Sequence, residues 1–265
     1  MRMSILWEGK LMRKCLSIIF YEYKMQMKRF ATWGVFILVM VIVLIDNFPS
    51  AKNLNRLEFL TEPAYFLYRT MSLDGLVLVF ALLFLLSGRF PLDKKTGVKP
   101  LIMASPITKG QYVIGKLLGG FCYTFTMLFL LLTVNVLIYL VAASFKISIL
   151  SCIAALLKTL MISVLPVSIF VGFVTVALPA IMDVRLFYLI ASTLFIVNAA
   201  TAVSAEAMPF YFITSGDLIK LIWQHPKWPF TNMGSIQANL IFLLGCGLLS
   251  WSLLLLSPKF WRADE

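Results

Sequence analysis

The chain has 265 residues, of which 61% are hydrophobic and 13% are charged. Soluble domains are roughly 45–50% apolar and about 25% charged, so this composition excludes a soluble class and predicts an all-α, polytopic membrane protein. The net charge of +11 would suit a nucleic-acid-binding protein. We expect it to reflect membrane topology instead, with the lipid bilayer rather than nucleic acid as partner.

Residues 1–30 are predicted to form an amphipathic helix at the cytoplasmic membrane surface. Basic side chains are spread along the whole segment instead of preceding a short apolar core, which excludes a signal peptide. The apolar residues recur at steps of three and four, and they are Met12, Leu16, Ile19, Phe20, Tyr23, Met27 and Phe30. Such a stripe beside basic residues is typical of a helix lying in the lipid headgroups. A plain cytoplasmic tail is the alternative.

A single transmembrane domain, residues 31–257, is predicted to follow. About 20 apolar residues, rising about 1.5 Å each, cross the hydrocarbon layer. The third apolar segment is longer and must tilt or project from the bilayer. Pro166 predicts a kink in the fourth, and Pro179 predicts its end. The six expected spans are residues 31–47, 73–90, 117–145, 159–178, 186–204 and 237–257.

The loop at residues 91–116, between the second and third spans, has features of a folded element. Pro100 suits the first turn of a short helix, and Ser105-Pro106 then interrupts it. Thr108 and Gln111 have the spacing of a capping box, which predicts a new helix that runs into the third span. The sequence therefore predicts a short cytoplasmic helix that could take a push from a soluble partner. A basic loop that only fixes topology is the alternative.

The segment at residues 205–236 is rich in aromatic residues and proline, and it is too broken to span a membrane. We expect short helices at the outer surface, with Trp223 and Trp228 at headgroup depth. A re-entrant plug is the alternative. His225, the only histidine of the chain, is expected to be solvated or hydrogen-bonded.

The distribution of basic residues predicts the orientation. With the N-terminus inside, 16 of the 23 lysines and arginines lie in cytoplasmic segments, including the tail at residues 258–265. Cytoplasmic loops are enriched in lysine and arginine, so both termini are predicted to be cytoplasmic.

No catalytic motif is found. The sequence contains no HExxH metal motif, no GxSxG nucleophile motif and no Walker A motif, and its four cysteines lack metal-ligand spacing. We therefore expect no catalytic, cofactor or metal site in this chain. The spans also hold few ionisable residues away from their ends, whereas ion-coupled transporters usually carry them at mid-membrane. This pattern favours a translocator that is powered from outside the chain.

The chain resembles the permease subunit of type 2 ATP-binding-cassette (ABC) transporters. The local match covers Asp93 to Gly97, then Leu101, Ser105-Pro106-Ile107 and Tyr112 to Lys116. Thr96-Gly97 is reversed relative to the usual order, and Lys94-Lys95 stands where acidic residues are frequent. The resemblance implies a loop that docks on a separate ATPase subunit, which would bind ATP and Mg. The residues it assigns to this contact are Asp93, Lys94, Lys95, Thr96, Gly97, Pro100, Leu101, Ser105 and Pro106.

The resemblance also implies a second permease chain, in a homodimer or heterodimer, and a multi-pass location in a bacterial plasma membrane. The expected function is export of a hydrophobic or amphiphilic substrate, with a peptide or antimicrobial compound as one candidate. Small, weakly polar residues in the fifth span suit a translocation path or subunit interface, or packing within one subunit; they are Ser192, Thr193, Asn198 and Thr201. The alternative functions are a non-enzymatic channel, sensor or assembly subunit, and an intramembrane enzyme.

Overall fold

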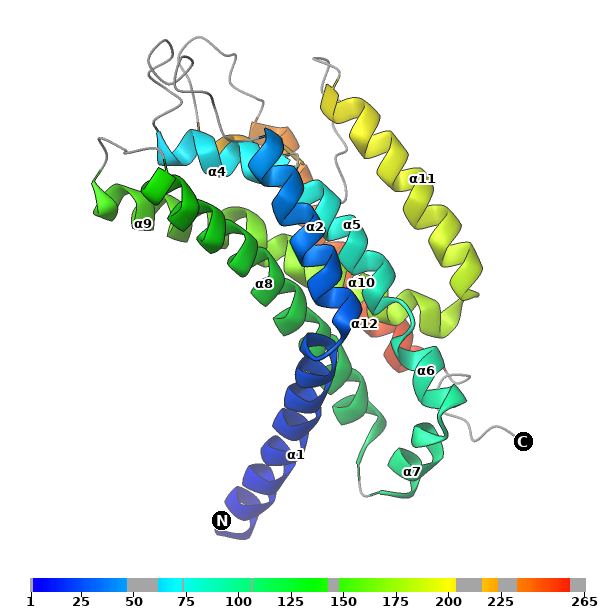
Figure 1. Ribbon diagram of the computed structural model, residues 1–265. Coiled ribbons are helices and arrows are strands. Elements are labelled where there is room, and N and C mark those ends of the chain that lie inside the picture. Colours follow the sequence, from blue (N-terminus) through cyan, green and yellow to red (C-terminus); the bar gives the residue numbers. More distant parts are fainter. Residues whose placement is uncertain are drawn as a thin grey trace.

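The computed structural model describes residues 2–46, 62–72, 74–105, 107–142, 148–203, 216–223 and 233–257. All the secondary structure in these ranges is helical, and the helices gather into one bundle from which α1 projects (Figure 1). Trp228 and His225, on which part of the outer-loop prediction rests, lie outside the described residues.

The first two helices meet at a sharp bend. Helices α1 (Arg2–Met27) and α2 (Phe30–Asp46) form an angle of 60°. Two basic residues, Lys28 and Arg29, occupy the break. Helix α1 lies along the first part of α8 (Figure 1). Its predicted apolar stripe packs only in part, because Tyr23 and Met27 lie against the core while Leu16 and Phe20 are exposed. The polar side chains of Glu22 and Gln26 are buried on the packing face.

The next part of the chain contains four short helices and one long one. Helices α4 (Pro63–Ser72) and α5 (Asp74–Leu86) lead to α6 (Arg89–Lys95). Two helices then cover the predicted helix–break–helix loop: α7 (Val98–Ala104) and α8 (Lys109–Ala142). Gly97, at the start of α7, has φ 72°, a left-handed conformation that glycine adopts without steric cost.

The fourth predicted span is one continuous helical run with a π-turn inside it. Helix α9 (Ile149–Thr159) continues through η2 (Leu160–Val164) into α10 (Leu165–Ile181). The N–H of Leu165 donates to the carbonyl of Leu160, five residues back. The irregularity expected from Pro166 thus takes the form of a π-turn just before it. Pro179 was expected to mark the end of this span, but α10 continues two residues further because proline removes only its own N–H donor.

Three helices complete the described chain: α11 (Val184–Val203), the 3₁₀ helix η3 (Gly216–Leu221) and α12 (Met233–Leu256). Helix α11 stands at the side of the bundle (Figure 1), where the ring of Phe195 contacts that of Phe80 of α5, with centroids 4.2 Å apart and the ring planes tilted by 59°. Around η3, Leu218, Ile219 and Trp223 are buried. The indole N–H of Trp223 donates to Glu62 at 2.6 Å.

Length and composition identify the helices that could cross a membrane. Among the described residues, four runs qualify, at 74–93, 109–141, 149–181 and 236–256, and the bent pair 14–27 and 30–45 makes a fifth if it counts as one span. The apolar part of α11, residues 184–197, is shorter than a full span. The chain is therefore all-helical and compatible with a multi-pass membrane protein, with fewer full-length candidates than the six predicted.

Helices α8 and α10 cross with their backbones almost in contact. A Cβ atom built on Gly172 would lie 2.5 Å from the backbone nitrogen of Phe121, and one on Gly120 would lie 3.0 Å from the carbonyl oxygen of Gly172. Small residues allow this kind of approach in membrane helices. The crossing holds α8 against α10 at the centre of the bundle.

Candidate functional site

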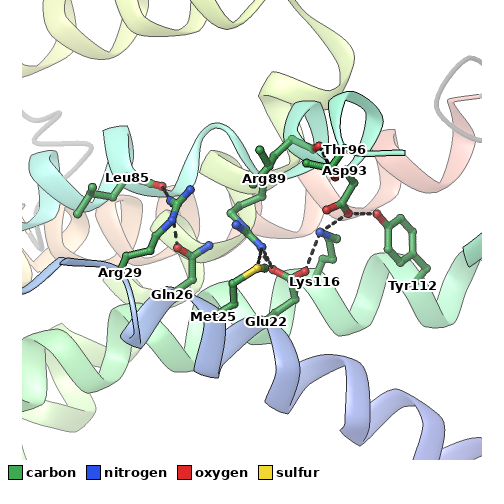
Figure 2. Close-up of polar contacts among 11 residues, drawn as sticks. Glu22, Met25, Gln26, Arg29, Leu85, Arg89, Asp93, Thr96, Tyr112 and Lys116 are labelled. Carbon is green, nitrogen blue, oxygen red and sulfur yellow. Dashed lines mark hydrogen bonds and ion pairs between the residues drawn. The ribbon is translucent and has the colours of Figure 1, made fainter. Parts of the chain in front are cut away.

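A buried network of four charged residues joins three helices, α1, α6 and α8 (Figure 2). Glu22 of α1 lies at its centre. One carboxylate oxygen accepts from the Nε and Nη2 of Arg89, at 3.1 and 2.7 Å, and the other forms an ion pair with Lys116 at 2.7 Å. The exposed fractions are 5% for Glu22, 1% for Arg89 and 2% for Lys116. Such burial is tolerated only because each charge is paired.

Asp93 completes the network. Its Oδ2 forms an ion pair with Lys116 and accepts a hydrogen bond from the hydroxyl of Tyr112. Lys116 therefore bridges two carboxylates, and the charges alternate from Arg89 to Glu22 to Lys116 to Asp93. The charges of the two acids and the two bases sum to zero. The network is a neutral, internally paired unit, although each member alone would be costly to bury.

Local helix periodicity places these side chains together. Arg89 and Asp93 are four residues apart on α6, and Tyr112 and Lys116 are four apart on α8, so each pair lies on one helix face. Gly119 lets α1 approach, since a Cβ there would lie 2.6 Å from the Cβ of Glu22. Without that close approach, the carboxylate of Glu22 would not reach the space between α6 and α8.

A second set of polar contacts fastens the bend between α1 and α2. Arg29 donates to the carbonyl oxygen of Leu85, at the end of α5, at 3.0 Å (Figure 2). The hydroxyl of Thr32 donates to the carbonyl oxygen of Gln26 and lies 3.0 Å from the hydroxyl of Tyr123 on α8. The bend is thus tied to α5 and α8, next to the charged network.

Both helices of the predicted helix–break–helix loop are present among the described residues. Thr108 and Gln111 make both hydrogen bonds of a capping box, at 3.1 and 3.3 Å, which confirms that prediction. Ser105 ends α7 in an extended conformation. The amino group of Lys109 donates to the carbonyl oxygens of Leu255 and Ser257, at 2.6 and 2.8 Å, and so caps the end of α12.

The residues predicted to contact an ATPase fall into two groups. Lys95, Thr96, Gly97, Pro100 and Leu101 are exposed around α7, and Leu101 is 72% exposed. Asp93 differs, because it is buried in the charged network and only 7% exposed. Ser105 is half-buried, the Lys94 side chain is not described, and Pro106 lies outside the described residues.

A cavity of about 660 Å³ lies between α1, the α6–α7 segment and α8. Ile18 and Met25 line it from α1, and Val98 and Ile102 line it from α7. Glu22, Asp93 and Tyr112 of the network also line it. The cavity therefore joins the polar network to the exposed short helix.

The predicted path residues lie elsewhere, on α11. Ser192 and Thr193 are exposed, and the hydroxyl of Thr193 donates back to the carbonyl of Leu189 at 3.0 Å. Asn198 and Thr201 belong to the same helix, but their side chains are not among those described. The exposure of Ser192 and Thr193 in a single chain is compatible with contact with lipid or with a second subunit.

Sequence reasoning missed Glu22 and the roles of Arg89, Tyr112 and Lys116. One signal was available: Arg89 with Asp93 and Tyr112 with Lys116 both show the four-residue spacing of a shared helix face. Among the described residues, no group of three or more His, Cys, Asp or Glu side chains could hold a metal ion. The chain matches no protein-family model, no curated protein and no solved structure.

Proposed function

We propose that the chain is the transmembrane permease subunit of an ABC transporter that exports a hydrophobic or amphiphilic substrate. In this proposal a separate ATPase subunit binds ATP and Mg and supplies the energy. A second permease chain completes the translocation path in a bacterial plasma membrane.

One observation carries the proposal: an exposed short helix lies between two helices that a buried charged network joins to each other and to α1. Helix α7 presents Leu101 at the surface, and it is flanked by α6 and α8, whose buried charges are joined through Glu22. In this proposal, a force applied to α7 would pass through its two flanking helices into α1. A loop that only fixed topology would not need this connection.

The proposed topology has six spans with both termini in the cytoplasm. Helices α2 and α11 would supply the two remaining spans, although the apolar part of each helix alone is shorter than a full span. The exposed Leu16 and Phe20 of α1, next to basic residues, support a helix lying at the inner membrane surface. Burial of Leu218 and Ile219 near η3 supports the re-entrant alternative for the outer segment.

The first test is capture of the ATPase. Tagged protein purified from membranes of its source cells is expected to bring down a protein with a Walker A motif, identified by mass spectrometry. The variant Lys95→Glu/Leu101→Asp removes an exposed apolar contact and reverses a charge on the α7 surface, so capture is expected to fall by about tenfold or more.

The matched control is Arg185→Glu, which makes the same charge reversal at another exposed site that the proposed topology places on the cytoplasmic side. It is expected to leave capture unchanged. Equal loss in both variants would show that α7 has no specific role. Absence of any ATPase with the unmodified protein would favour the channel, sensor or assembly alternative.

The second test concerns the fifth span. In a protein without its four native cysteines, cysteine is placed singly at Ser192, Thr193, Asn198 or Thr201. At least one position is expected to crosslink between two chains, or to react with a polar thiol reagent during ATP-driven turnover. A cysteine placed at the residue next to the reactive position lies about 100° further around the helix, and it is expected to react much less. If all four stay inert in resting and driven states, α11 borders only lipid or its own chain.

A further inference from the structure

Two buried N–H donor groups beside the charged network have no hydrogen-bond partner in the described part of the chain. They are the Nη1 of Arg89 and the Nε2 of Gln26. Each residue is only 1% exposed, so bulk water does not serve them. Buried polar groups are nearly always hydrogen-bonded, and an unpaired donor carries the full cost of its lost hydration. The two groups therefore indicate a place for an acceptor.

The contacts of α1 bring the two donors to the same place. Arg89 donates to the Oε2 of Glu22 at 2.7 Å and to the Sδ of Met25 at 3.3 Å. Gln26 is the next residue after Met25 and lies one helical turn from Glu22. On its other side, the amide oxygen of Gln26 accepts a hydrogen bond from Arg29 at 3.4 Å. The Gln26 side chain thus lies between the two arginines (Figure 2).

A single amide oxygen is present for the two arginines. It faces Arg29, and the amide NH₂ of Gln26 is left on the side of Arg89 (Figure 2). If the amide were turned over, its oxygen would serve Arg89 and its NH₂ would meet Arg29 instead. A donor would face a donor in either orientation. The partner of these donors must therefore be an acceptor that the described side chains do not supply.

The charge around Gln26 favours an anion over a water molecule as this acceptor. The four-residue network is neutral, and Arg29 adds one positive charge next to it. Burial, and then the positive charge of Arg89, lower the pKa of Arg29, so two like charges lie close together. A water molecule would bring two hydrogens into a place that already has too many donors. A halide ion brings none and carries the compensating charge.

We propose that a small monovalent anion of the size of chloride binds between Gln26 and Arg89, where it accepts hydrogen bonds from Nε2 and Nη1. The burial of both donors restricts the occupant to a small ion, because a lipid phosphate is bulky and stays attached to its lipid. The bound anion would join α1 to α6 next to the bend that Arg29 fastens to Leu85. Binding requires only this chain, so the inference goes beyond the proposed transport function and its test needs no ATPase.

The first measurement is thermal unfolding of the full chain in nanodiscs of zwitterionic lipid, followed by tryptophan fluorescence. Chloride is replaced stepwise by gluconate, an anion too large for the site, at a constant ionic strength of about 0.15 M. With chloride at about ten times its Kd, the ratio of folded to unfolded protein is expected to be about elevenfold higher than in gluconate, which raises the Tm. Bromide is expected to replace chloride. Equal Tm values in chloride and gluconate would overturn the proposal and leave a water molecule as the acceptor.

Two variants locate the effect. Gln26→Glu supplies a fixed carboxylate to the two arginines, so its Tm is expected to be independent of chloride and, in gluconate, no lower than that of the unmodified protein. Gln111→Glu is the matched control, because it makes the same change in a capping box that accepts either residue, and it should keep the full chloride dependence. In chlorine NMR, the unmodified protein and the control are expected to broaden the chloride line more than Gln26→Glu does. Chloride dependence that survives in Gln26→Glu, or equal line broadening by the three proteins, would place the anion elsewhere and overturn the proposal.

Discussion

Replacement of Glu22 by methionine is expected to lower the free energy of unfolding by about 3–5 kcal/mol, because it leaves a buried arginine and a buried lysine with one acid between them. Glu22 is the only carboxylate bonded to Arg89 among the described residues and is one of two paired with Lys116. Reversible unfolding in mixed micelles, titrated with a denaturing detergent, measures the loss.

A second variant separates the charge effect from a packing effect. Glu22→Met/Arg89→Met removes one acid and one base and leaves the neutral pair of Lys116 and Asp93. It is expected to recover most of the lost stability, since well-packed apolar residues can replace a buried ion pair at little cost. If the double variant is as unstable as the sum of the two single variants, the network is not an energetic unit.

The matched control is Asp183→Asn. Asp183 is exposed and accepts a hydrogen bond from the backbone N–H of Arg185 at 2.7 Å, at the start of α11. Asparagine caps helices about as well as aspartate, so this loss of one carboxylate is expected to change stability by less than about 0.5 kcal/mol.

The second large effect is expected at Gly172. Substitution by alanine is expected to cost about 2–3 kcal/mol, because its Cβ would lie 2.5 Å from the Phe121 nitrogen and 2.7 Å from the Phe121 Cα. Both atoms belong to the backbone, so relief requires α8 and α10 to move apart. Gly172→Leu is expected to prevent recovery of monodisperse protein, as measured by size-exclusion chromatography.

Gly245 is the matched control for this prediction. It also lies in a long apolar helix, yet a Cβ there would have no atom within 4 Å. Gly245→Ala is expected to be neutral or to stabilise the protein by up to about 1 kcal/mol, through helix propensity alone. Equal destabilisation by the Gly172 and Gly245 alanine variants would mean that the crossing of α8 and α10 is not as close as described.

Features with a local cause could be predicted from the sequence. Thr108 and Gln111 form the expected capping box because its two hydrogen bonds join residues three apart. Pro100 lies in the first turn of α7, and Ser105 ends that helix, as the break signals indicated. In each case the determining contacts lie within one or two turns, where residue type alone carries the information.

The charged network could not be predicted because its partners are distant in sequence. Arg89 and Glu22 are separated by 67 residues, and their meeting depends on how α1 lies on α8. The apolar stripe of α1 did not reveal this, since only part of the stripe packs against the core and the packing face also carries Glu22 and Gln26. Lipid is as apolar as a protein core, so hydrophobic periodicity does not distinguish a lipid-facing side from a packed side. The backbone approach at Gly119 and Gly172 likewise depends on the three-dimensional crossing of helices.

The contact of Lys109 with the end of α12 has a consequence for the order of assembly during synthesis. The two carbonyl groups that Lys109 binds belong to residues 146 and 148 positions later in the chain. A ribosome must therefore complete α12 before the start of α8 can acquire its final set of bonds. A chain that stops before α12 would carry the α7 segment without this last fastening. The short surface helix thus reaches its finished state only in molecules whose final described helix has been made and folded into place.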